Sequence, residues 1–184
     1  AAAVILFLII QFTRDDTSFP GTDSAEAGFA RDMKTHHAQA VEMASIVRDR
    51  LSGSETPLHF FLTDMIQTQI NQMGQMEAWL NIWDVPQGST DPPMAWMGHE
   101  VTGRMPGMAS NEEIAELRTL PENEMVVRFM ELMIVHHQSA VDMANAIIER
   151  SDNDVVLRVA EAIVRTQQAE IDLMDDMLTQ LGAE

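Results

Sequence analysis

Apolar side chains recur three and four positions apart along most of the chain, which is the spacing of one buried helix face. The pattern predicts four long helices, at residues 23–51, 57–83, 121–150 and 154–181. Three residue pairs have the chemistry of helix starts: Asp23 with Glu26, Thr56 with Pro57, and Ser110 with Glu113. Pro and Gly interrupt residues 84–120, where only the last of these pairs indicates a short helix. The sequence therefore predicts an all-α fold.

The chain contains an internal repeat, because residues 129–144 match residues 29–44 without a gap. Both segments read Met-x-x-His-His-x-x-Ala-x-x-Met-Ala. Residues 170–177 likewise match residues 69–76 in the partner helix of each half. Neither helical hairpin can bury its apolar stripe alone, so two hairpins packed together predict a four-helix bundle. We expect this bundle at residues 24–184, with repeat one at 24–83, a Met-rich connection at 84–120 and repeat two at 121–182.

The first twelve residues are almost entirely apolar, but a membrane-spanning helix needs roughly 20 such residues. Two interpretations remain: the core of a signal peptide, or the outer end of a truncated membrane anchor. We expect the anchor at residues 1–12, followed by a polar linker at 13–23 that carries the bundle on the extracytoplasmic side of the membrane.

Each repeat places two thioethers and two imidazoles on one helix face, and further methionines lie on the partner helices. The candidate metal ligands are Met33, His36, His37, Met43, Met133, His136, His137, Met143, Met73, Met76, Met174 and Met177. Thioether sulfur suits Cu(I), and imidazole also binds Cu(II), so copper is the expected metal with Cu(I) preferred. Di-iron bundles carry Glu-x-x-His, whereas this chain carries Met-x-x-His and lacks the expected inner carboxylates. Glu42 and Asp142 are the candidate acceptors for imidazole N–H groups.

The composition adds two constraints. The chain has 15 Met and no Cys, so soft ligation depends on thioethers rather than thiolates, although Met is also ordinary core filler. Its formal net charge of −18 argues against nucleic-acid binding and favours cations. The connection holds a second methionine group, which fits either a copper-capture lid or a hydrophobic flap: Met94, Met97, Met105 and Met108, with His99.

The doubled motif resembles the bacterial family known as domain of unknown function 305, and residues 105–114 look like the family's stretch before its second motif. The likeness runs from about Glu26 to Leu181. It implies a ferritin-like four-helix bundle, usually exported or anchored, and copper binding through Met and His in some members. The second motif has Ile134-Val135 where the first has Lys34-Thr35, which would make the two sites unequal.

We therefore expect an extracytoplasmic copper-binding protein that buffers, sequesters or delivers copper and is not an enzyme. One alternative is a ferritin-like oxidase of Cu(I) or Fe(II), which steady oxygen consumption would reveal. Another is a non-metal accessory subunit that docks through its acidic surface on a membrane complex, such as a copper-dependent respiratory complex. Co-purification with such a complex, without metal, would favour this third interpretation.

Overall fold

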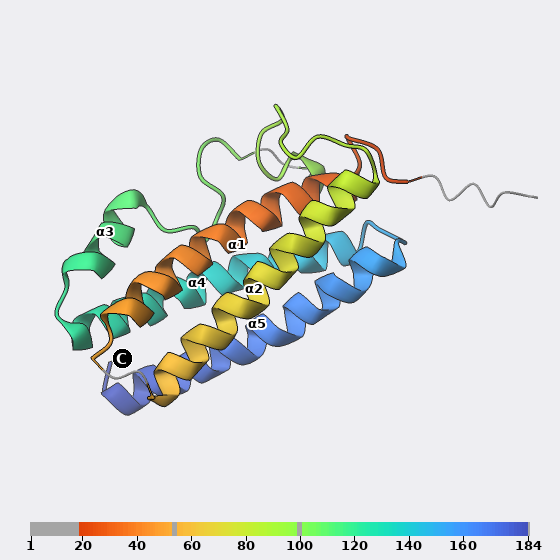
Figure 1. Cartoon of the computed structure of the whole chain (residues 1–184). Coiled ribbons are helices and arrows are strands. Elements are labelled where there is room, and N and C mark those ends of the chain that lie inside the picture. Colours follow the sequence, from red (N-terminus) through yellow and green to blue (C-terminus); the bar gives the residue numbers. More distant parts are fainter. Residues whose placement is uncertain (1–18, 53–54, 99–100, 184) are drawn as a thin grey trace, which may run out of the picture.

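Five α-helices and no strand make up the described part of the chain, which in this computed structural model comprises residues 19–52, 55–98 and 101–183. The helices are α1 (Ala25–Arg50), α2 (Pro57–Ile82), α3 (Asn111–Thr119), α4 (Glu122–Ile148) and α5 (Asp154–Leu181), with a short 3₁₀ turn η1 (Ala95–Met97) (Figure 1). The predicted all-α fold is confirmed.

Local sequence determines most of the helix starts. Thr56 caps α2 with Pro57 in the first turn, and Ser110 and Glu113 form the predicted reciprocal capping box of α3. The prediction for α1 was wrong by one residue. Ser24, rather than Asp23, accepts the capping hydrogen bond from the backbone N–H of Ala27.

The four long helices pack as two antiparallel hairpins, α1 with α2 and α4 with α5, as Figure 1 shows. The hairpins join mainly through α1 and α4, whereas α2 and α5 make few direct contacts. A polar groove of about 650 Å³ runs between α2 and α5 and includes Asp64, Asn71, Gln72 and Arg158 in its lining. The bundle is therefore tightly closed on one side and open along the opposite seam.

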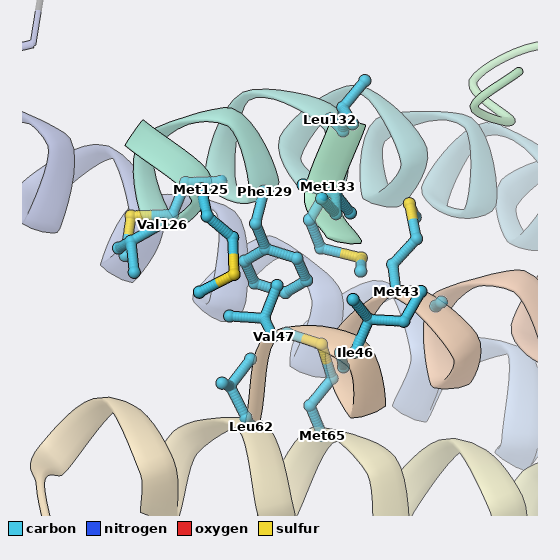
Figure 2. Close-up of a cluster of buried hydrophobic side chains, with 14 of the residues drawn as sticks. Met43, Ile46, Val47, Leu62, Met65, Met125, Val126, Phe129, Leu132 and Met133 are labelled. Atoms are coloured by element: carbon cyan, nitrogen blue, oxygen red, sulfur yellow. The ribbon is translucent and has the colours of Figure 1, made fainter. Parts of the chain in front are cut away.

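Two apolar clusters fill the bundle on either side of its centre. The first, which we call the Met43 cluster, draws on residues 40–47 of α1 and 125–133 of α4 and is drawn in Figure 2. The second, the Met33 cluster, draws on residues 27–33 of α1 and 140–147 of α4. The two histidine pairs lie on α1 and α4 between these clusters.

The Met-rich connection packs on the side of the bundle formed by α1 and α4. Met94 and Met105 are buried in the Met33 cluster, and Met97 and Met108 pack against it. Asp32 holds the connection by accepting from the Met94 backbone N–H at 2.8 Å and the Trp96 indole at 2.9 Å. The packing of these methionines fits a hydrophobic flap, one of the two interpretations that the sequence allows. His99 lies outside the described residues.

Residues 1–18 also lie outside the described residues, so the anchor and most of the predicted linker remain expectations from the sequence. None of the helices in the described ranges combines the length and the apolar character needed to cross a bilayer.

Candidate metal centre

All four motif histidines are buried at the centre of the bundle, each 0–1% exposed. The rings of His36 and His136 stack across the contact between α1 and α4, with centroids 3.7 Å apart and planes 34° apart. The centroid of His137 lies 6.3 Å from that of His136. Neither member of either pair faces solvent. The structure instead brings both pairs into one group, which we call the histidine layer.

The second histidine of each pair contacts the partner helix of its own hairpin. His37 Nε2 lies 2.7 Å from Gln72 Oε1 on α2, and His137 Nε2 lies 2.7 Å from Glu170 Oε2 on α5. Because these oxygens accept, the ring proton sits on Nε2 and the lone pair on Nδ1. Each outer acceptor thus leaves Nδ1 of its histidine free to bind a metal ion.

Several polar atoms of this centre have no hydrogen-bond partner among the described residues. They include both ring nitrogens of His36 and His136, Nδ1 of His37 and His137, and amide atoms of Gln69 and Gln167. Leaving a buried polar group unpaired costs about 1–3 kcal/mol. Such atoms are rarely concentrated at one place unless they have a function.

Burial keeps the imidazoles of His36, His37 and His136 neutral. Loss of hydration, with a smaller effect of the neighbouring histidines, lowers the pKa of His36 to about 3. The same loss lowers the pKa of His37 to about 4, and it holds the pKa of His136 well below its usual range. At these three histidines a metal ion therefore meets nitrogens that already carry free lone pairs at neutral pH.

The motif methionines divide between the two flanks of the histidine layer. Met33 and Met143 join Met76 in the Met33 cluster. Met43 and Met133, which Figure 2 labels, belong to the Met43 cluster. Met174 belongs to the same cluster. All six side chains are fully buried. Each flank thus brings together thioethers from both repeats rather than from one.

The two remaining candidate methionines are placed less centrally. Met177 is half-buried and packs against the Met43 cluster. Met73 is half-buried and is not among the side chains that pack against either cluster. Each partner helix thus buries one of its two candidate methionines, Met76 on α2 and Met174 on α5. These two residues are not equivalent in the repeat, because Met76 aligns with Met177.

The predicted acceptors for the imidazole N–H groups were wrong. Glu42 and Asp142 are exposed, and Glu42 pairs with Arg118 at 2.8 Å. Gln72 and Glu170 are the residues that contact the imidazoles. The prediction that the bundle lacks an inner carboxylate was also wrong, because Glu170 is buried beside His137. The repeat does draw attention to Glu170, because this residue begins the matched segment of α5 and aligns with Gln69 of α2. Both side chains are buried.

Within the described residues, no three side chains from His, Asp and Glu already converge as a metal-binding set. Gln72 lines the groove between α2 and α5, so that groove is where the histidine layer comes close to solvent.

The sequence profile of the family described as Domain of unknown function (DUF305) matches residues 26–178. A DUF305 protein from Streptomyces coelicolor, whose description proposes that it is secreted, is 46% identical, with a TM-score of 0.83 over 89% of this chain and 98% of that one. A DUF305 fragment from Deinococcus radiodurans is 35% identical, with a TM-score of 0.69 over 85% of this chain and 96% of that one.

Structures of CopM share the fold. Its Cu(II)-bound form is 25% identical, with a TM-score of 0.65 over 85% of this chain and 97% of that one. Its Cu(I)-bound form is 23% identical, with a TM-score of 0.61 over 85% of this chain and 96% of that one. No match was found among curated protein sequences. With the family profile covering the whole helical bundle, the chain belongs to the DUF305 family.

Proposed function

We propose that this protein binds copper at the histidine layer and buffers, sequesters or delivers it outside the cytoplasm. The observation that carries the proposal is the group of buried imidazole nitrogens without hydrogen-bond partners, drawn from both repeats. Neutral imidazoles bind copper in either oxidation state, and they need not lose a proton first. His36 and His136 supply nitrogens after their stacked rings turn toward the ion, and His37 and His137 supply Nδ1.

Thioethers from the flanking clusters complete the ligand set and favour Cu(I). Met33 and Met143 serve one flank with Met76, and Met43 and Met133 serve the other with Met174. The likeness to CopM in its Cu(I)-, Cu(II)- and silver-bound forms supports a soft-metal assignment. Met73 and Met177 are the weakest members of the predicted set, because both are half-buried.

The proposed location rests on the apolar start of the chain and on the relative described as secreted. Residues 1–12 anchor the protein, and the bundle faces outward, where it receives copper or hands it to a membrane complex. Reporter fusions after Glu184 test the topology. A fusion that is active only in the cytoplasm would refute it.

Competitive copper titration tests the binding site. Replacing Met33, Met43, Met133 and Met143 with Leu preserves volume and apolarity, so the fold survives. The Cu(I) affinity should fall more than about tenfold, the loss that changes in outer-shell residues already produce, while Cu(II) affinity falls less. Met125→Leu with Met130→Leu is the matched control, because both residues are fully buried outside the motif.

Replacing the four motif histidines should weaken binding of both Cu(I) and Cu(II). If the methionine variant binds Cu(I) like the parent protein, the thioethers are core filler. If the histidine variant also binds copper normally, the histidine layer is not the site.

A second function is favoured by Glu170, which places a carboxylate beside a buried histidine, since di-iron bundles build their metal sites from inward-facing Glu and His side chains. A ferritin-like oxidase would consume oxygen steadily when supplied with Cu(I) or Fe(II). The copper-binding proposal predicts no turnover beyond one equivalent of bound metal.

A further inference from the structure

The two halves of the histidine layer differ in the charge of one hydrogen-bond acceptor. His37 meets the neutral amide of Gln72, whereas His137 meets the carboxylate of Glu170, at the same distance of 2.7 Å. Glu170 is the only acidic side chain among the buried residues that the structure describes. The sequence difference before the histidine pairs does not produce this inequality, since it arises on the partner helices.

We propose that Glu170 is a specificity-determining residue, and that its charge sets the balance between Cu(II) and Cu(I) at the His137 half of the histidine layer. This inference rests on the proposed copper-binding function. On the His137 side the ion then has a carboxylate next to one of its ligands, which favours Cu(II), whereas the uncharged Gln72 on the His37 side gives no such preference.

The physical argument is one of buried charge. Neutral imidazoles and thioethers leave the full ionic charge of copper uncompensated, and burying an uncompensated charge is costly. That cost rises steeply with charge, so it is greater for Cu(II) than for Cu(I). One adjacent carboxylate reduces the net charge of either complex by one unit, which benefits Cu(II) more. Glu170 also fixes the orientation of the His137 ring by contacting its Nε2 at 2.7 Å.

Two isosteric substitutions test the proposal in opposite directions. Glu170→Gln removes the charge while keeping an oxygen acceptor, and Gln72→Glu adds a charge at the residue that contacts His37 as Glu170 contacts His137. The dissociation constants for Cu(II) and Cu(I) are measured by competition with chelators under oxidising and reducing conditions. The reduction potential of the bound copper gives an independent value for their ratio.

Glu170→Gln should weaken Cu(II) binding relative to Cu(I) by about 10- to 100-fold. A tenfold change in this ratio raises the reduction potential by about 59 mV for a one-electron couple. Gln72→Glu should shift the ratio and the potential in the opposite direction. Glu161→Gln and Gln67→Glu make the same chemical changes at exposed positions of α5 and α2. These control variants should leave the ratio of the dissociation constants and the reduction potential unchanged.

If Glu170→Gln binds copper at the histidines but the ratio stays within about twofold of the parent value, this inference is wrong and the proposed function stands. The same conclusion follows if the exposed controls shift the potential as much as the buried variants. If the parent protein binds neither form of copper in a histidine-dependent way, the proposed function and this inference both fail. Thermal unfolding of the four variants verifies that each is folded.

Discussion

Adjacent histidines on one helix reach two different neighbours in this bundle. Successive residues of a helix point about 100° apart, and α1 contacts both α2 and α4. His36 therefore stacks on a ring from α4, while His37 bonds a side chain of α2. The second repeat does the same with His136 and His137. A His-His pair thus contributes to one central group without either ring reaching solvent.

The buried histidines should make the metal-free protein lose stability as the pH falls. Unfolded histidine protonates at its ordinary pKa of 6.5, whereas folding lowers the pKa of His36 to about 3 and of His37 to about 4. The unfolded state therefore binds more protons below pH 6.5, and stability present above that pH is lost as the pH falls toward the folded values. The slope approaches about 1.4 kcal/mol per pH unit for each such histidine.

Urea unfolding of the metal-free protein from about pH 7 to about pH 5 measures this slope. A variant with His36→Leu and His136→Leu provides the comparison, since its exposed carboxylates titrate as before. The parent protein should lose stability over this range faster than the variant. Equal slopes would mean that these histidines are already protonated in the folded state.

The same pair of substitutions should stabilise the metal-free protein at neutral pH while weakening copper binding. The four ring nitrogens of His36 and His136 are unpaired in the core, and apolar replacements remove that cost. The expected gain is about 1–3 kcal/mol in the free energy of unfolding. A site retained for function often carries such a cost. A clear loss of stability would indicate that ring stacking, rather than metal binding, explains the pair.

At the scale of elements, two helical glycines predict opposite effects of the same substitution. A Cβ at Gly28 on α1 would lie 2.6 Å from the Trp96 ring, which the connection lays against that helix. A Cβ at Gly74 on α2 would meet nothing within 4 Å. Gly74→Ala should therefore increase the free energy of unfolding by up to about 1 kcal/mol, because Ala has the higher helix propensity.

Gly28→Ala should instead lower the free energy of unfolding by about 1–3 kcal/mol, because the added methyl group overpacks the contact. It should also displace the Trp96 ring. Thermal unfolding measures both changes, and tryptophan fluorescence follows the displacement. If both variants are stabilised equally, the connection does not pack on α1 as described.

Helix content was predictable because it depends on local pattern. Apolar spacing gave the four long helices, and the capping chemistry of Ser110 with Glu113 gave α3. The burial of Met94 and Met105 was not predictable, because a loop methionine is buried only when tertiary packing folds the loop onto a helix. The role of Glu170 was missed for a similar reason, since no local pattern tells which partner-helix residue reaches a histidine.

In the whole molecule, the two repeats meet at one pair of equivalent residues, His36 and His136. The antiparallel crossing of α1 and α4 centres on His36 and His136, so the motif methionines of the two repeats meet in mixed pairs on either side. The repeat alone could not predict this crossing, because it does not say which faces of the two hairpins join. The histidine layer belongs to the assembled bundle and to neither hairpin alone.

Copper should therefore link the two hairpins. Binding stabilises the folded state by about 2.7 kcal/mol when free copper is 100 times the dissociation constant. Hydrogen exchange should slow most in the central turns of α1 and α4, which carry the histidine layer. The four-histidine variant should show neither effect. Protection confined to one hairpin would contradict a site built from both repeats.

X-ray absorption of the copper-loaded protein tests the central claim most directly, because it identifies the atoms bound to copper. We expect imidazole nitrogen together with thioether sulfur around Cu(I). We further expect that the sulfur signal falls in the variant with Leu at Met33, Met43, Met133 and Met143, and that the imidazole signal falls in the four-histidine variant. A copper environment that is the same in all three proteins, or that contains oxygen without imidazole, would contradict the assignment of the histidine layer as the copper site.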